Sequence, residues 1–433
     1  MNNLSSLFPK YKYKGAIFLY LCIDLKSFYA SVECIERNYN PLTTPLVVAD
    51  ASKGKGSICL AISPALKNKG VRNRCRLYEI PETIFYIIAK PRMKKYIEYS
   101  ARIYRIFLQF VAKEDIHVYS IDESFIYIQP YLHLYKKTPI EMGKIIIEEI
   151  FKQTKLIATC GVGSNLFLAK VALDLLAKNS KDGIAFLNEP LFKEKLWDYT
   201  PLSDFWQIGV KSEKRLNKLH LYTLKDIAFA PQEILFDEFK SNAIELIEHA
   251  WGKESTTMKD IKNYVTNDHS LSSGQTLERD YFYNEVLLIV KEMVELLSLD
   301  LIHHHYVTDG ISISISYSHQ YNIKTTRKGK RLDIKTNSYE ILKKEILELY
   351  QLSTHKNIPI RKIRISFHVI NDSFEQYHLL FDEKKILKEK KLHETIDKIK
   401  DKHGKSAIIR GMNLQKNATT LKRNKQIGGH NES

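Results

Sequence analysis

The sequence of 433 residues is poor in cysteine and holds no long apolar run, and both absences exclude classes of protein. Its five cysteines include no pair at C-x-x-C spacing, so neither a zinc site nor a disulfide framework is expected. Such cysteine usage is typical of a reducing, cytoplasmic compartment. No stretch approaches the ~20 apolar residues of a membrane helix. Residues 10–23 imitate a signal peptide only weakly, because the apolar run is short, ends at Asp24 and has no small-residue cleavage site.

Positive charge, in contrast, is in excess. Lysine and arginine total 66 against 50 aspartates and glutamates, a formal net charge of +16. Residues 301–433 hold 26 of these basic residues and 14 acidic ones, so most of the excess lies in the last third. This balance favours a polyanionic partner, with nucleic acid before a membrane surface. On composition alone, a soluble basic surface with no such partner is an equal alternative.

Strand and helix patterns alternate along the first half of the chain, which predicts an α+β or α/β domain. Residues 17–23 form an apolar run typical of a buried strand, and helical spacing follows it. Further elements are expected at about 91–111 (helix), 116–128 (strand), 140–152 (helix), 156–163 (strand) and 165–178 (helix). Short helices follow residue 188. A polar stretch that ends near 270 precedes a last domain of long helices and alternating strands.

Three carboxylates occupy unusual places in these strands. Asp24 ends the first strand, while Asp122 and Glu123 interrupt a later one, where buried charges are costly unless they are paired. If the two strands are neighbours in one sheet, the three side chains converge. Hard oxygen ligands of this kind suit Mg²⁺. For any single one of these acids, an ordinary ion pair at a strand end is the more common explanation.

Three stretches, "CIDLKSFYASVE", "YSIDESF" and "GVGSNLFLAKVALDLLAK", together resemble the Y-family of translesion DNA polymerases. Further stretches, "PRMKKYIEYSARIYRIF", "SSGQTLERDYF", "GKSAIIRGMNL" and "IGGH", resemble its UmuC-like, UvrX-type branch from Gram-positive bacteria. The resemblance implies an α+β polymerase right hand with short fingers, a helical thumb and an α/β little finger. The implied domains are a palm at 15–30 and 96–188 within a UmuC-type domain of about 19–209, fingers at 31–95, a thumb at 189–255, a linker at 256–270, a DNA-binding little finger at 271–410 and a basic tail at 411–433.

The resemblance also implies roles for the acids. Asp24, Asp122 and Glu123 correspond to catalytic metal ligands, and the Leu25 carbonyl to a main-chain ligand, with two Mg²⁺ ions per site. Such ions, ~4 Å apart, activate the primer hydroxyl and stabilise the leaving pyrophosphate. Phe28 and Tyr29 correspond to the aromatic residues at the incoming sugar, with Tyr29 as the steric gate against ribose. An ordinary core aromatic is the alternative for Tyr29.

Further residues are implied at the nucleotide. Lys67 and Lys178 align with lysines that reach the triphosphate, where each acts as a point charge, and Ser63 lies beside this group. A solvated surface lysine is the alternative for both. The chain departs from many relatives at Pro64, where a phosphate-binding tyrosine is common. Lys26 and Tyr127 also replace carboxylates that are common elsewhere in the family, although neither carboxylate is an essential ligand there.

Three segments are candidates for contacts to DNA or to a sliding clamp. The stretch "IGVKSEKRLNKLHL" resembles a helix-hairpin-helix with one glycine where two are usual; a plain helical hairpin is the alternative. In the last domain, "TTRKGKRLDIK" is expected to be a basic loop beside the strand "IRKIRISFH". "QYHLLFDE" resembles a degenerate clamp-binding peptide or, equally, an edge strand. The residues concerned are Gly209, Lys211 and Lys214; Arg361, Lys362 and Arg364; and Gln376, Leu380 and Phe381.

The resulting prediction is a template-directed, error-prone DNA polymerase acting on primer-template DNA and dNTPs. The sliding clamp and a recombinase filament are candidate partners, and no membrane is involved. Short fingers without a long closing helix predict an open site that tolerates damaged templates, and no segment resembles a proofreading exonuclease. Two alternatives stay open: a catalytically silent, polymerase-derived DNA-binding accessory protein, and a nucleotidyl cyclase. The three retained carboxylates oppose the first, and the basic C-terminal domain opposes the second.

Overall fold

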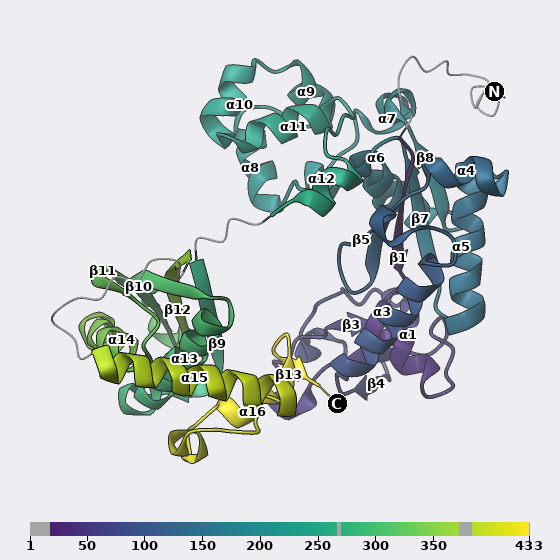
Figure 1. The fold of residues 1–433 in the computed structure, drawn as a ribbon. Coiled ribbons are helices and arrows are strands. Elements are labelled where there is room, and N and C mark those ends of the chain that lie inside the picture. Colours follow the sequence, from purple (N-terminus) through teal and green to yellow (C-terminus); the bar gives the residue numbers. More distant parts are fainter. Residues whose placement is uncertain (1–17, 266–269, 372–382, 433) are drawn as a thin grey trace. The chain divides into compact units, whose positions relative to one another are not determined.

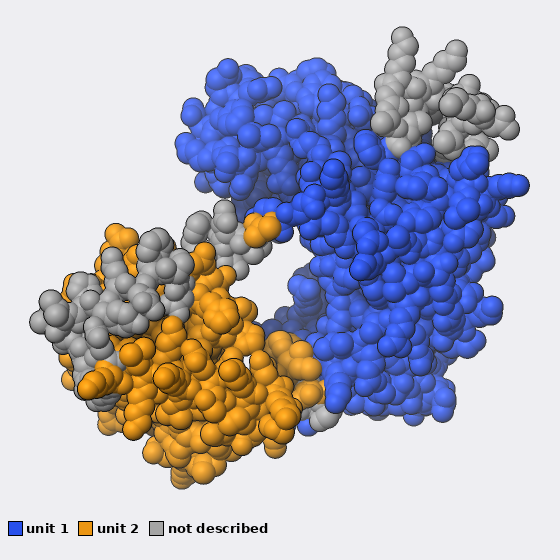
Figure 2. Space-filling model, viewed as in Figure 1, with its two compact units in different colours: residues 1–264, 433 blue, residues 265–432 orange. Residues whose placement is uncertain are grey.

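A computed structural model describes residues 18–265, 270–371 and 383–432 of the chain. It divides into two compact units, unit 1 (residues 1–264 with 433) and unit 2 (residues 265–432), coloured separately in Figure 2. The boundary between them lies inside the stretch expected to be a linker. Among the described residues, no helix combines the length and the apolar character needed to cross a membrane.

The centre of unit 1 is a five-stranded mixed sheet with the order β5-β6-β1-β7-β8 (Figure 1). Its central strand β1 pairs antiparallel with β6 and β7, and β7 pairs parallel with β8. The apolar run "YLCIDL" explains why β1 is central, since a strand covered on both faces needs apolar residues throughout. The strands are β1 (Tyr20–Leu25), β5 (Ile116–Val118), β6 (Glu123–Tyr127), β7 (Ala158–Gly163) and β8 (Ile184–Leu187).

Helices cover both faces of this sheet. Leu21 and Cys160 approach Gly143 of α5, whereas Tyr20 and Cys22 belong to a core with residues of α6. Because side chains alternate along a strand, the even-numbered positions of β1 face α6. The helices of this region are α1 (Phe28–Ile35), α3 (Met93–Phe107), α4 (Gln129–Tyr135), α5 (Pro139–Thr154) and α6 (Leu166–Val171), which continues through a π-helical turn (Ala172–Leu176) and a 3-10 turn (Ala177–Asn179).

Two smaller assemblies complete unit 1. A three-stranded sheet, β3-β2-β4, lies between α1 and α3 in sequence; its elements are β2 (Leu46–Val48), β3 (Ala61–Ile62), α2 (Pro64–Lys67) and β4 (Ile87–Ala89). A helical region follows the central sheet and packs on its own apolar cluster. Its helices are α7 (Glu189–Leu196), α8 (Val210–Lys218), α9 (Leu224–Phe229), α10 (Gln232–Phe239) and α11 (Asn242–Ala250).

The stretch expected to be a linker, 256–270, contains a helix, α12 (Met258–Asn263), that belongs to unit 1. Met258 is buried in the same core as Tyr20 and Phe125. The Lys262 ammonium donates to the Ile116 carbonyl of edge strand β5 at 2.5 Å. Part of the polar stretch is therefore fastened to the sheet edge, which its composition did not reveal.

Unit 2 is built on a four-stranded antiparallel sheet, β11-β10-β12-β9, with helices packed on one face. The stretch "TTRKGKRLDIK", expected to be a loop, is almost entirely strand β11. Its backbone pairs with β10, from Thr326 opposite Ile315 to Thr336 opposite Thr308. The elements are β9 (Ser270–Tyr281), α13 (Tyr283–His303), β10 (Tyr306–Tyr317), β11 (Thr326–Thr336), α14 (Tyr339–Ser353), β12 (Ile360–Asn371) and α15 (Glu383–His403).

The C-terminal segment, expected to be a basic tail, folds onto unit 2. The Glu292 carboxylate of α13 is only 3% exposed. It accepts hydrogen bonds from the Thr419 amide at 2.8 Å and the Thr420 amide at 3.2 Å. The segment contains a 3-10 turn (Gly411–Leu414), α16 (Thr420–Asn424) and the hairpin of β13 (Gln426–Ile427) and β14 (His430–Asn431). A buried carboxylate thus holds together parts of the chain that are far apart in sequence.

Candidate active site

The three predicted carboxylates converge at the ends of two neighbouring strands. Asp24 of β1 pairs in register with Glu123 of β6, and the Leu25 amide donates to the Asp122 carbonyl at 3.1 Å. Asp24 occupies an even-numbered position of β1 and therefore lies on the face covered by α6. The Asp122 carboxylate, just before β6, accepts from the Ser120 hydroxyl at 2.7 Å. The sequence predicted that the three carboxylates converge if their strands are neighbours, and β1 and β6 are neighbours in the sheet.

Two lysines pair with these acids. The Lys178 ammonium lies 2.7 Å from Asp24, and the Lys170 ammonium lies 2.8 Å from Glu123. Between the lysines stands Asp174, at 3.0 Å from Lys170 and 2.8 Å from Lys178. The five side chains thus form one row of alternating charge, which we call the charge row: Glu123, Lys170, Asp174, Lys178 and Asp24.

The local winding of the helix lines up the charge row. Positions 170, 174 and 178 span α6, the π-helical turn and the 3-10 turn that follows it. A wider π turn takes up one extra residue, and such turns are frequent at functional sites. Close approach to the sheet is possible because β7 carries glycines: a Cβ at Gly161 would lie 2.1 Å from the Ala169 carbonyl oxygen. The glycines therefore place Lys170 directly above the strand ends.

Burial and charge oppose one another in this site. Burial raises the pKa of Asp24 and of Glu123, and the paired lysines partly offset that effect. Burial lowers the pKa of Lys178, but Asp24 and Asp174 outweigh it, so the net pKa is raised. Lys67 is close enough to interact with both Asp24 and Lys178. Desolvation of its ammonium and the charge of Lys178 lower its pKa, and Asp24 only partly offsets them. All four groups belong to one electrostatic system.

Sequence analysis missed Lys170 and Asp174. The signal was present, because three charged residues at i, i+4 and i+8 interrupt the otherwise apolar stretch "LAKVALDLLAK". Lys170 is almost fully buried, and a lysine is rarely buried without a partner. That spacing alone pointed to a row of paired charges on the helix, although it did not name the strand acids that complete the row.

The turn between β1 and α1 positions the predicted sugar residues. Ser27 adopts a left-handed conformation (φ 51°), which is uncommon for a residue with a side chain, and its buried hydroxyl has no hydrogen-bond partner among the described residues. Phe28 then enters the core. Half-exposed Tyr29 stacks on Tyr96 of α3, with ring centroids 4.3 Å apart and planes at 15°. Tyr29 is thus held rigidly, five residues from Asp24.

The predicted residue Ser63 caps the short helix α2, and Lys67 is its last residue. Ser63 is fully buried, and its hydroxyl accepts from the Leu46 amide at 3.0 Å and the Leu66 amide at 3.4 Å. The structure thereby gives this hydroxyl a helix-capping role, and its contact to a nucleotide stays a prediction. Lys67 is exposed, and its charge interacts with those of Asp24 and Lys178.

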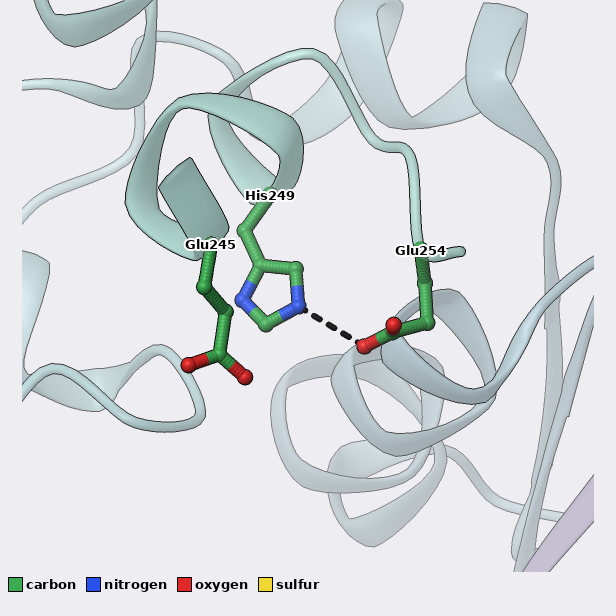
Figure 3. A group of neighbouring side chains, drawn as sticks. All are labelled: Glu245, His249 and Glu254. Atoms are coloured by element: carbon green, nitrogen blue, oxygen red, sulfur yellow. Dashed lines mark hydrogen bonds and ion pairs between the residues drawn. The ribbon is translucent and has the colours of Figure 1, made fainter. Parts of the chain in front are cut away.

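Aromatic and polar contacts fasten the helical region to the central sheet. The His249 ring of α11 stacks on Phe167 of α6 with centroids 4.1 Å apart. Its Nε2 donates to the Glu254 carboxylate at 3.0 Å (Figure 3). Glu245 lies one helical turn before His249. Trp206 donates to the Tyr119 hydroxyl at 3.1 Å, next to the loop that carries Asp122. The three side chains of Figure 3 are close enough to hold a metal ion. In this structure, His249 packs between the helical region and α6 of the central sheet region.

The predicted DNA contacts lie on exposed surfaces of both units. Gly209 precedes α8, and Lys211 and Lys214 are exposed on its first turns. A 3-10 turn (Leu202–Asp204) rather than a full helix precedes the hairpin. On β12, Lys362 and Arg364 point away from the core, whereas Arg361 lies at a register shift and pairs with Asp280 at 3.6 Å. The predicted clamp motif, Gln376, Leu380 and Phe381, lies outside the described residues.

The charges of the site fit a divalent cation. Asp24, Asp122, Glu123 and Asp174 carry four formal negative charges against three positive charges on Lys170, Lys178 and nearby Lys67, so among the described residues one negative charge is in excess. All of the carboxylate donors are hard oxygens, the ligands that Mg²⁺ prefers. Lys170 and Lys178 pair with Glu123, Asp174 and Asp24, so a bound cation would share these acids with two ammonium groups.

Comparisons with known proteins agree with this arrangement. Residues 23–174 match the impB/mucB/samB family. UvrX of Bacillus subtilis (strain 168), named for UV-damage repair, is 34% identical over 412 residues, covering 95% of this chain and 97% of that protein. "DNA polymerase IV 2" of the same organism is 28% identical, covering 94% and 97%.

The fold is likewise that of solved polymerases. A Y-family DNA polymerase chimera between Dbh and Dpo4 matches with a TM-score of 0.62 at 20% identity, covering 81% of this chain and 98% of that one. At this identity the likeness concerns the fold alone. Together with the near-complete match to UvrX and the impB/mucB/samB domain around the carboxylates, it shows that this chain belongs to the Y-family of translesion DNA polymerases.

Proposed function

We propose that the protein is a template-directed, error-prone DNA polymerase that extends primers past lesions by two-metal nucleotidyl transfer and does not proofread. The observation that carries the proposal is the register of β1 and β6, which brings Asp24 opposite Glu123 with Asp122 beside them. Phosphoryl transfer needs little from a protein beyond metal ligands and positioning, and this cluster supplies the ligands.

Each residue of the site has a role in this proposal. Asp24, Asp122, Glu123 and the Leu25 carbonyl would hold two Mg²⁺ ions. When bound, such ions lower the pKa of the attacking hydroxyl and neutralise charge on the triphosphate. Lys178 and Lys67 would pair with phosphate oxygens as point charges.

The sugar of the incoming nucleotide would lie against Tyr29, with Phe28 supporting the turn from the core. Tyr29 cannot easily retreat, because its ring stacks on buried Tyr96. A rigid ring of this kind can reject a ribose by contact with its 2′-hydroxyl. The error-prone character follows from the small β3-β2-β4 region, whose longest helix, α2, spans Pro64–Lys67 and is too short to close over a base pair.

DNA would be held through its phosphates, without reading of sequence. The exposed face of the unit 2 sheet suits this purpose, since small residues of β10, Ser312, Ser314 and Ser316, alternate with its buried core positions. Arg364 pairs across from Ser314 and Gly274, and Lys362 across from Thr276. Because the neighbouring serine, glycine and threonine side chains are small, Lys362 and Arg364 could approach the DNA phosphates closely. Gly209, Lys211 and Lys214 would add contacts at the start of α8.

The same proposal assigns the parts of the chain. The palm comprises 15–30 and 96–188, the fingers 31–95, the thumb 189–255 and the little finger 271–410. Helix α12 belongs with the palm edge rather than with a free linker, because Lys262 binds the Ile116 carbonyl. The segment after 411 belongs with the little finger through Glu292.

Primer extension with Mg²⁺ and dNTPs tests the proposal against its alternatives. The expected result is template-directed extension on both undamaged and lesion-containing templates, without removal of mismatched ends. Binding without extension would favour the catalytically silent DNA-binding protein, and cyclic nucleotide formation from NTPs would favour a cyclase. Adding a sliding clamp or a recombinase filament to the same assay tests those two candidate partners.

A further inference from the structure

The charge row contains an acid, Asp174, that the proposed function does not use. Asp174 is the central member of the row and contacts both lysines, at 3.0 Å and 2.8 Å. It pairs with neither Asp24 nor Glu123, because one lysine of the row separates it from each of them. Its backbone lies in the π-helical turn, whose winding places it between positions 170 and 178. The molecule thus maintains an unusual helix geometry where this carboxylate stands.

The Lys178 ammonium is shared between two acids. Asp24 lies 2.7 Å from it and Asp174 lies 2.8 Å from it, so the two contacts are nearly equal. In the proposed function, Asp24 must give its oxygens to a cation and Lys178 must turn toward a triphosphate. Because the Asp24 side chain is only 17% exposed, separating it from Lys178 is costly unless each charge keeps another partner. Asp174 is this second partner of Lys178.

We propose that Asp174 is a positioning residue that takes over Lys178 when Asp24 binds a cation. Without Asp174, the Lys178 ammonium would depend on Asp24 alone and would compete with the cation for it. Lys170 experiences the same effect at Glu123, because Asp174 is also its second partner. The inference rests on the proposed function, because it assigns Asp24 and Glu123 to cation binding.

Binding of Mn²⁺ to the full-length protein, followed by electron paramagnetic resonance of the unbound ion, tests this role without measuring catalysis. We expect Asp174→Asn to weaken Mn²⁺ binding at least about fivefold, because the ammonium groups then compete for the ligands. Lys178→Met removes the competitor and should tighten binding. The double variant Asp174→Asn/Lys178→Met should bind more tightly than Asp174→Asn alone. That recovery distinguishes positioning from a merely structural role, because a second substitution would not repair a distorted site.

Asp182→Asn is the matched control, since Asp182 pairs with Lys144 at 3.2 Å on an exposed surface and should leave binding unchanged. Wild-type affinity in Asp174→Asn, or no recovery in the double variant, would overturn the inference. If Asp174→Asn does not fold, Lys178→Met still decides, because unchanged or weaker Mn²⁺ binding contradicts competition by this lysine. Asp24→Asn reports separately on the proposed function: it must abolish binding whatever Asp174 does.

Discussion

Tyr29 is the side chain on which sugar selection should depend. Its ring is fixed by the stack on Tyr96 and by the left-handed turn at Ser27, so it cannot yield to a 2′-hydroxyl. We expect Tyr29→Ala to keep adding dNTPs, less efficiently, and to accept NTPs much more readily. The ratio of kcat/KM for dCTP over CTP opposite template G should fall at least about tenfold, or ~1.4 kcal/mol.

Tyr29→Phe is the matched control for that change. It keeps the ring and removes only the hydroxyl, so discrimination by contact should be retained. A Tyr29→Ala enzyme with the wild-type ratio would mean that the sugar lies elsewhere, and the placement of the nucleotide on Lys67 and Lys178 would have to be revised.

Substitution of Asp122 should abolish nucleotide addition without abolishing the binding of primer-template DNA. Its carboxylate contacts Ser120 and lies beside Asp24, whereas the exposed cations proposed for DNA lie on α8 and on unit 2. Asp122→Ala is therefore expected to abolish detectable primer extension while the Kd for primer-template DNA changes less than about threefold. Fluorescence anisotropy and extension on the same substrate measure both quantities. Near-normal extension by the variant would remove Asp122 from the metal site.

At the scale of elements, helices α1 and α3 are joined by a buried carboxylate. Glu33 is 0% exposed and accepts from Arg92 at 2.9 and 3.0 Å and from the Tyr96 hydroxyl at 2.8 Å. Burial acts to raise the pKa of Glu33, but hydrogen bonds from Arg92, Arg37 and Tyr96 outweigh it and hold the pKa below its usual value. The ionised carboxylate is therefore the form that the fold stabilises.

We expect Glu33→Gln to lower the free energy of unfolding by about 3 kcal/mol at pH 7, since it removes the buried charged partner of the Arg92 guanidinium, which then keeps, among the described acids, only a longer contact with Glu36 at 3.9 Å. Because the folded pKa lies below the unfolded one, the advantage of wild type is complete above about pH 5. It is lost as the pH falls through the folded pKa. Urea unfolding at pH 7 and near pH 3.5 measures both effects.

Glu98→Gln is the control for this prediction, because Glu98 pairs with Lys95 on the surface of the same helix α3. Exposed pairs of this kind contribute less than about 1 kcal/mol. A loss in Glu33→Gln no larger than in Glu98→Gln, or one that persists unchanged at low pH, would show that the joint between α1 and α3 does not depend on the charge.

Several elements could be predicted from the sequence because local pattern and tertiary context agree. The apolar run before Asp24 fixes β1, and β-branched and aromatic residues around Asp122 and Glu123 fix β6. The three acids of the proposed metal site could therefore be placed in or beside these strands, although only the observed register shows that the two strands are neighbours. Family resemblance, rather than periodicity, supplied the roles of these residues.

Other elements depend on contacts that no local pattern reveals. Strand β11 carries few apolar residues and forms because β10 offers it a ladder of backbone hydrogen bonds. The C-terminal segment is ordered by Glu292, more than a hundred residues earlier. The spacing of Lys170, Asp174 and Lys178 is visible in the sequence, but their partners Glu123 and Asp24 on the strands follow only from the fold. Sequence analysis could therefore have found the helical part of the charge row, but not the whole row.

At the scale of the whole molecule, the proposed metal ligands and most of the excess positive charge lie in different units. The acids lie in unit 1, while residues 301–433, which hold 26 basic residues against 14 acidic ones, belong almost entirely to unit 2. Binding through phosphates releases counterions, so log K falls with log salt in proportion to the phosphates contacted. The excess charge of unit 2 should therefore set the salt dependence of DNA binding.

We expect the double variant Lys362→Ala/Arg364→Ala to weaken binding of primer-template DNA uniformly across sequences. It should also flatten the slope of log K against log salt by about two, since each phosphate contact contributes ~0.9. Both side chains are exposed on β12, above the serine and glycine positions of β10 and β9, so their removal leaves the core intact. Fluorescence anisotropy at salt concentrations from about 50 to about 200 mM measures the slope.

Lys343→Ala/Lys344→Ala makes the same change of charge on α14, which packs against the opposite, buried face of the sheet. If the exposed face binds DNA, this control should lower affinity only slightly and leave the slope within about 0.5 of wild type, because distant charges are screened. An equal flattening by both double variants would mean that net charge alone attracts DNA. An unchanged slope in Lys362→Ala/Arg364→Ala would mean that the sheet of unit 2 does not contact the phosphates.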